Sequence, residues 1–138
     1  MNGIVVTGKF TGIEKIMADM ERREEMIVRT IDASLGVIAR DAAGRMRQAM
    51  NSARSPSPPG SAPAVFSGNL VKSISAVHKI GSLQSAVVIK GKAAHWHLLE
   101  FGTRKMAARP FIRPHGRAAA IDGEELINRA VGRVARGR

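Results

Sequence analysis

Residues 11–50 decide the fold, and they read TGIEKIMADMERREEMIVRTIDASLGVIARDAAGRMRQAM. Their apolar side chains recur at steps of mostly three and four, the spacing of one face of an α-helix. The positions are Ile13, Ile16, Met17, Met20, Ile27, Ile31, Leu35, Ile38, Ala42, Met46 and Met50. Thr11 and Glu14 are typical of a capping box, and Asn51 and Ser52 end the pattern. The stretch therefore predicts one long amphipathic helix, whose ends we expect to reach past the core toward a neighbouring subunit.

The segments on either side of this helix predict a strand and a connector. Ile4–Thr7, followed by Gly8, favours a short strand before the helix. Residues 52–66 hold the run SPSPPG and a further proline at Pro63, which indicates a loop with polyproline character. A stiff connector is the expected role of this loop.

Two apolar runs after the connector predict a β-hairpin. Ser73–Ile80 and Leu83–Lys90 flank Gly81-Ser82, and glycine at the first central position suits a two-residue type II′ turn. That turn pairs Ile80 with Leu83, Ala76 with Val87, and Ile74 with Ile89, all on one face. Because the register from the turn agrees with the register from the apolar pattern, the hairpin is expected to have one buried and one wetter face.

The last third of the chain predicts two further helices. Residues 94–101 favour a short helix, and Gly102 follows where a left-handed cap residue is needed. Pro114 suits the first residue of a final helix that runs to about Ala135.

Charge is unevenly distributed over the 138 residues, whose net charge is +11. Residues 1–51 hold 8 Lys or Arg and 7 Asp or Glu, whereas residues 52–138 hold 14 and 4. The second part therefore projects a positive field, which favours nucleic acid or an acidic protein surface as a partner, with a solubilising charge excess as the alternative.

Several classes of protein are disfavoured by composition. The chain has no cysteine, so disulfides and thiolate metal sites are excluded. No apolar run approaches the roughly 18 residues of a membrane span. The N-terminus lacks the features of a secretory signal, so we expect an intracellular protein outside the membrane.

The most distinctive stretch is Leu99-Glu-Phe-Gly-Thr103, followed by Ala108-Arg-Pro-Phe-Ile-Arg-Pro114. Together with Ser67-Gly-Asn-Leu-Val-Lys-Ser-Ile74 after a Pro-rich loop, it resembles the tail-completion (head–tail joining, minor tail) proteins of long-tailed bacteriophages and prophages. Ser67 stands where that family usually has threonine. His95-Trp96-His97 stands where it often has Tyr-Ala.

This resemblance implies a fold, a role and partners. The implied fold is α+β, with a long N-terminal helix and a C-terminal helix on a small, mainly antiparallel sheet. One domain would span residues 1–138, with 1–51 as strand and helix, 52–66 as loop, 67–112 as sheet and motif region, and 113–138 as helix and basic tail. Similar proteins form a homo-oligomeric ring, commonly of six subunits, at the head-proximal end of the tail. Such a ring joins the tail tube protein to the head connector, lets double-stranded DNA pass, and is assembled in the bacterial host cytoplasm.

The motif residues are expected to be architectural. Gly102 would supply a positive φ, and Phe101 and Phe111 would anchor the loop between them onto the core. Glu100 would bond local backbone amides or pair with Arg104 or Arg109. Thr103, Pro110 and Pro114 complete the motif, and the two prolines would stiffen the entry to the last helix.

Five basic residues in and after the motif form the candidate contact surface. They are Arg104, Lys105, Arg109, Arg113 and Arg117, with a second cluster at Arg129, Arg133, Arg136 and Arg138. Without a recognition helix or base-stacking aromatics, any DNA contact would be with phosphates and independent of sequence. Acidic patches on neighbouring subunits are the other candidate partner.

No catalytic motif stands out, so we expect a protein that is not an enzyme and needs no cofactor or metal. A Gly-x-Ser-x-Gly elbow and a Walker-type phosphate loop are both absent from the sequence. Two alternatives stay open: a free-standing basic nucleic-acid-binding protein, and a small metal-dependent hydrolase using His95, His97 and Glu100. The second is disfavoured because residues two apart diverge on a helix.

Overall fold

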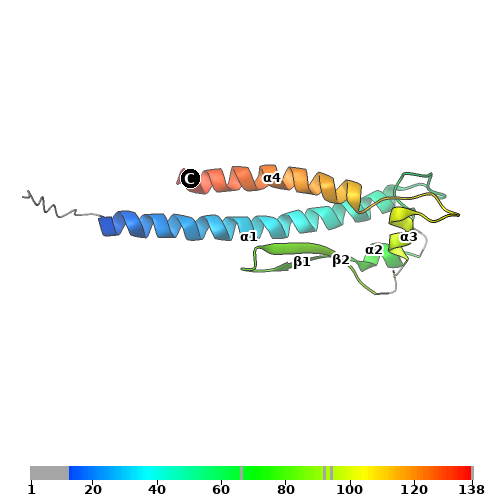
Figure 1. Ribbon diagram of the computed structural model, residues 1–138, viewed down its shortest axis with the longest axis horizontal. Coiled ribbons are helices and arrows are strands. Elements are labelled where there is room, and N and C mark those ends of the chain that lie inside the picture. Colours follow the sequence, from blue (N-terminus) through cyan, green and yellow to red (C-terminus); the bar gives the residue numbers. More distant parts are fainter. Residues whose placement is uncertain (1–12, 66, 92, 94, 138) are drawn as a thin grey trace, which may run out of the picture.

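The computed structural model describes residues 13–65, 67–91, 93 and 95–137. Helix α1 (Ile13–Ser52) has 40 residues and forms the long axis of the molecule. At 1.5 Å per residue it is about 60 Å long. Helix α4 (Arg113–Ala135) lies along one side of α1, and the hairpin lies along another (Figure 1). The predicted long helix and α+β class are confirmed, while the strand predicted at Ile4–Thr7 and the cap residue Thr11 lie outside the described residues.

The hydrophobic core lies against the C-terminal half of α1. It is built from Ala42, Ala43, Met46, Met50, Ile74, Phe111 and Ala119, all buried. Three of these seven residues are alanines, two on α1 and one on α4, and their small side chains let helices approach closely. The N-terminal half of α1 contributes almost nothing to this core, because residues 14–26 are exposed.

One glycine fixes the closest approach of α4 to α1. Gly123 is buried, and a Cβ atom at this position would lie 2.6 Å from Ile38 Cδ1. Ile38 therefore occupies the space that any other side chain at position 123 would need. Arg45, which contacts both Asp41 and Asp122, links the same two helices beside this contact.

The hairpin has the predicted register but a different turn. Strands β1 (Ile74–Lys79) and β2 (Gln84–Ile89) are antiparallel and pair Ile74 with Ile89 and Ala76 with Val87. The predicted two-residue turn is wrong, because residues 80–83 form a longer loop. The Ser82 amide donates to the Lys79 carbonyl at 3.1 Å, and Gly81 has a φ of +81°. The strands end early because Asp32 on α1 accepts hydrogen bonds from two amides of this loop.

Three short features complete the fold. Helix α2 (Asn69–Ser73) was not predicted, and it delays the start of β1 by one residue. Helix α3 (Trp96–Phe101) lies within the predicted range, and α4 ends at the predicted Ala135. Within the described ranges, no helix combines the length and the apolar composition that a bilayer crossing requires.

Candidate functional site

Glu100 organises the junction between α3 and α4. Its side chain is only 1% exposed, although it is a carboxylate. Oε2 accepts hydrogen bonds from the amides of Phe111 at 2.8 Å and Ile112 at 2.9 Å, and Oε1 accepts from the Arg113 amide at 3.0 Å. Arg113 Nε adds a fourth donor at 3.2 Å. The prediction of local backbone bonding is confirmed, and the ion-pair partner is Arg113, not Arg104 or Arg109.

These contacts determine the charge state of Glu100. Burial raises the pKa of a carboxyl, but the amides of Ile112, Phe111 and Arg113 stabilise the ionised form. The hydrogen bonds outweigh the desolvation, and the pKa of Glu100 lies below its ordinary value. Since the three amides lie at the first residue of α4 and the two positions before it, the carboxylate also compensates the positive end of that helix dipole.

Gly102 makes the sharp exit from α3 possible. Its φ is +75°, as predicted, but its ψ of 179° is extended and not left-handed helical. This combination is accessible almost only to glycine. A Cβ atom here would lie 2.8 Å from the Ala108 nitrogen and 2.9 Å from the Met106 oxygen, both in the backbone. Thr103 then pairs with Met106 in a tight loop, and its hydroxyl accepts from the Lys105 amide.

The two phenylalanines of the motif have different environments. Phe111 is fully buried at 0% exposure, as predicted, whereas Phe101 is 63% exposed. The expectation that Phe101 anchors the loop onto the core is therefore wrong. The Glu100 side chain is the one buried at the end of α3, because it accepts hydrogen bonds from three backbone amides there. Phe101 instead lies beneath the Arg113 guanidinium, which is 5.0 Å from the ring centroid.

Two of the five predicted basic residues bond other parts of the chain. Arg113 bonds Glu100, and Arg109 Nε donates to the Ser57 carbonyl at 3.1 Å in the Pro-rich loop. Arg104, Lys105 and Arg117 are exposed. We call residues 95–117 the basic corner, since they hold five Lys or Arg and one acid, a net charge of +4.

An apolar groove opens at this corner. It has a volume of about 320 Å³ and is lined by Met46, Val87, Ile89, Trp96, Phe101 and Ile112, with Glu100 and Arg113 beside them. Trp96 is half-buried against the core. The groove thus has an apolar floor, with the Arg113–Glu100 ion pair beside it.

The histidines of the hydrolase alternative, His95 and His97, do not gain Glu100 as a third ligand. Glu100 is occupied by its four donors, and His97 packs edge-on against Trp96 at 5.9 Å between ring centroids. No cluster of three or more possible metal-ligating side chains occurs among residues 13–65, 67–91, 93 and 95–137. The described geometry therefore offers no support for the hydrolase alternative.

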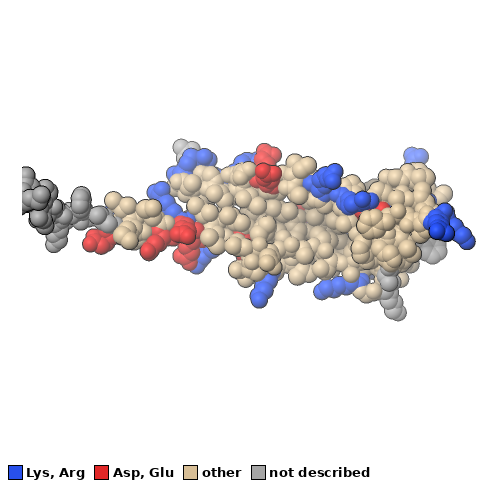
Figure 2. All heavy atoms as spheres, in the orientation of Figure 1, with Lys and Arg blue, Asp and Glu red and all other residues tan. Residues whose placement is uncertain are grey.

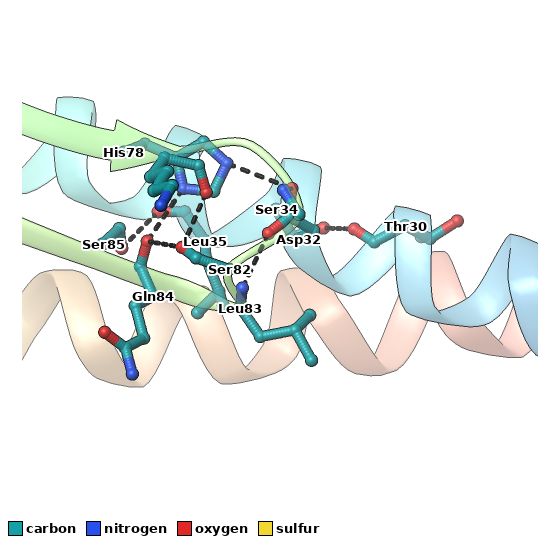
Figure 3. A network of polar contacts seen from close by, with 11 residues as sticks. Thr30, Asp32, Ser34, Leu35, His78, Ser82, Leu83, Gln84 and Ser85 are labelled. Atoms are coloured by element: carbon teal, nitrogen blue, oxygen red, sulfur yellow. Dashed lines mark hydrogen bonds and ion pairs between the residues drawn. The ribbon is translucent and has the colours of Figure 1, made fainter.

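A second buried carboxylate, Asp32, fixes the tip of the hairpin and was missed in the sequence (Figure 3). Its two oxygens accept from the amides of Gly81 at 2.8 Å and Leu83 at 3.0 Å. His78 Nε2 lies 3.3 Å from the same carboxylate, while His78 Nδ1 lies 3.1 Å from the Gln84 carbonyl. A neutral ring satisfies only one of these two acceptors, whereas the imidazolium satisfies both.

The contacts of Asp32 favour its ionised form. The Gly81 amide is the main reason that the pKa of Asp32 lies below its ordinary value, with burial opposing it and Leu83 and His78 adding to it. Nearby, the Ser85 hydroxyl donates to the Leu35 carbonyl at 2.8 Å. The sequence could have indicated this site. His78 and Ser85 fall on the inward face of the hairpin, where a polar side chain needs a polar partner.

The far end of α1 carries the opposite charge. Residues 14–28, which we call the arm, hold five acids and three bases, a net charge of −2. Figure 2 shows acidic side chains gathered over the start of α1, and basic side chains at the tip of the opposite end. The arm also exposes large apolar side chains, including Ile16 at 61%, Met17 at 56% and Met20 at 65%. The prediction that α1 reaches past the core is therefore confirmed at its N-terminal end.

Comparison with known proteins identifies the family. The family model described as "Bacteriophage HK97-gp10, putative tail-component" matches residues 14–102, which include α1, the hairpin and the exit from α3. Neither the curated proteins nor the solved structures gave a match. The match covers well over half of the chain and confirms the resemblance to phage tail-completion proteins drawn from the motifs. The chain therefore belongs to the HK97-gp10-like family of bacteriophage tail components.

Proposed function

We propose that the protein is a tail-completion subunit, which forms a ring at the head-proximal end of the tail and joins the tail tube to the head connector. The family match over residues 14–102 carries this proposal, because it makes the chain a phage tail component. The elongated shape supports it further, since the arm and the basic corner lie at opposite ends of one subunit (Figure 1). Such a subunit can contact two neighbours at once.

The proposed role needs no catalysis. The two buried carboxylates, Glu100 and Asp32, each accept hydrogen bonds from backbone amides of a distant segment. A carboxylate that is committed to such contacts fixes loops and is poorly placed for proton transfer to a substrate. Both groups therefore serve to hold surfaces in place, which suits a structural component.

The ring would let double-stranded DNA pass through its opening. Arg104, Lys105 and Arg117 are exposed, and two anionic surfaces would be available to them: the DNA and an acidic face of a neighbouring subunit. Contacts with DNA would be with phosphates and weak at physiological salt. Weak contacts suit a conduit, because tight binding would slow the transit of DNA.

The test is the structure of particles that lack the protein. Deleting its gene from the phage or prophage should leave filled heads and separate tails in electron micrographs, and a plasmid copy should restore joined virions. Joined virions without the protein would refute the proposal. A soluble monomer that binds DNA with a steep salt dependence would favour the free-standing nucleic-acid-binding protein instead.

A further inference from the structure

The arm presents an apolar surface that the rest of the subunit leaves uncovered. Ile16, Met20 and Ile27 are spaced by four and seven residues and so lie on one side of α1. An open groove of about 550 Å³ runs along this side, lined by Met17, Met20, Ile27 and Val28. Contiguous exposed side chains of this size mark an interaction surface, unlike isolated ones.

The neighbouring elements of the same subunit cover other sides of the arm. The end of α4 shares a groove with Met26 and Asp19, through Val134 and Gly137. The hairpin tip reaches α1 one to two turns later and extends the apolar surface, since Val28 also lines a groove with Ile80, which is 89% exposed. Ile16 and Met20 on the apolar side of the arm therefore remain exposed in the single subunit.

We propose that the arm of one subunit docks into the groove of the basic corner of a second copy. This inference rests on the proposed function, because the ring supplies the second copy. The groove at the corner has an apolar floor of Val87, Ile89 and Ile112 with Phe101 at its mouth, so it matches the apolar side of the arm. Docking would therefore remove the exposed apolar side chains of both surfaces from water.

Charge selects this pairing over the symmetric one. The arm carries −2 and the corner carries +4, so arm against corner is attractive. Glu21 and Glu24 border the apolar groove of the arm, and Arg104 and Lys105 are exposed at the corner. Two arms packed against each other would instead place these acids together, which is unfavourable.

The placement of the two surfaces also determines the kind of assembly. They are different patches at opposite ends of an elongated subunit (Figure 1), so the contact is head-to-tail. A repeated head-to-tail contact gives a closed ring when the rotations between successive subunits add up to one full turn. Otherwise it gives a filament. The arm–corner contact therefore provides the repeated interface that a ring requires.

A charge swap tests the pairing. The arm variant carries Glu21→Arg and Glu24→Arg, and the corner variant carries Arg104→Glu and Lys105→Glu. Each variant alone should need at least about tenfold more protein for half-maximal association in sedimentation velocity. An equimolar mixture should regain native association, because every contact in it can again join opposite charges.

A matched pair of substitutions tests the apolar part. Ile16→Asp should abolish association, whereas Ile121→Asp on α4 should leave it unchanged, although Ile16 is 61% and Ile121 is 64% exposed. The same variants are also tested for their ability to restore joined virions to a phage that lacks the gene. This second assay reports on the contact even if rings form only on tail tubes.

The outcomes separate the inference from the proposed function. Loss of joined virions with either charge variant and Ile16→Asp, but not with Ile121→Asp, supports the arm–corner contact. The contact is overturned if a corner variant associates and complements normally while the gene remains essential for joining. Joined virions in the complete absence of the gene would instead refute the proposed function.

Discussion

Replacing Glu100 with alanine should be among the most damaging single substitutions in this chain. The change removes the acceptor of three backbone amides and of Arg113 Nε. A buried donor left without a partner costs about 1–3 kcal/mol. The Phe111 amide would lose its partner in the core, whereas the amides of Ile112 and Arg113 lie nearer to solvent and would be partly hydrated. We therefore expect a loss of about 3–5 kcal/mol, from one fully unpaired buried donor and two partly hydrated ones.

Urea unfolding followed by Trp96 fluorescence measures this loss. Trp96 is the single tryptophan of the chain and lies on α3, one turn before Glu100. Glu124→Ala on α4 is the matched control, because Glu124 is exposed, and it should change the unfolding free energy by less than about 0.5 kcal/mol. A loss below about 1 kcal/mol for Glu100→Ala would show that the amides find other acceptors, and would refute the reasoning.

The same residue should make stability depend on pH. Because the pKa of Glu100 is lower in the folded chain than its ordinary value of 4.5, the carboxylate contributes its stability above that value. The contribution is lost as the pH falls from there through the lowered pKa. Glu100→Gln should therefore lose less stability than the native chain on acidification over this window, measured as urea midpoints. Parallel curves for the two proteins would contradict the assignment.

Three further substitutions test other contacts. Gly102→Ala should cost at least about 2 kcal/mol, because the new Cβ meets two backbone atoms and φ is strained; an unchanged melting temperature would show that the loop relaxes. Phe111→Ala should cost about 3–5 kcal/mol, since the ring is fully buried, and a small loss in urea unfolding would contradict that packing. Asp32→Ala should raise the hydrogen exchange rates of the Gly81 and Leu83 amides while those inside β1 and β2 stay protected. Equal protection in both proteins would show that another acceptor holds the tip.

The elements of the fold were predictable where a local pattern specifies them. The period of α1 and the register that pairs Ile74 with Ile89 were predicted correctly, because both depend on apolar spacing within one segment. The turn at Gly81 was not, since its shape depends on Asp32, a residue 49 positions away. Helix α2 is a single turn and leaves too short a pattern to detect.

The candidate site shows the same division. Gly102 and Phe111 were identified because their requirements, a positive φ and burial, are properties of the residue itself. Phe101 was predicted to pack on the core and is exposed, because hydrophobicity favours burying the ring over the acid, whereas the backbone bonding predicted for Glu100 is confirmed. The amides at the start of α4 reverse that order, and they come from a segment that sequence spacing does not place beside Glu100.

The contact of Gly123 with Ile38 has a consequence for the reach of the arm. A slide of α4 by about one helical turn would bring Ala119 or Ile127 against Ile38, where a Cβ atom has no room. The two helices therefore have a single axial alignment, and α4 always stops opposite the same turn of α1. Each residue inserted into the arm, before Val28, would lengthen the protruding part by about 1.5 Å and leave the contacts of Asp32 and Ile38 in place. The distance over which one subunit extends from its own body is thus set in the interior, by the absence of a single side chain.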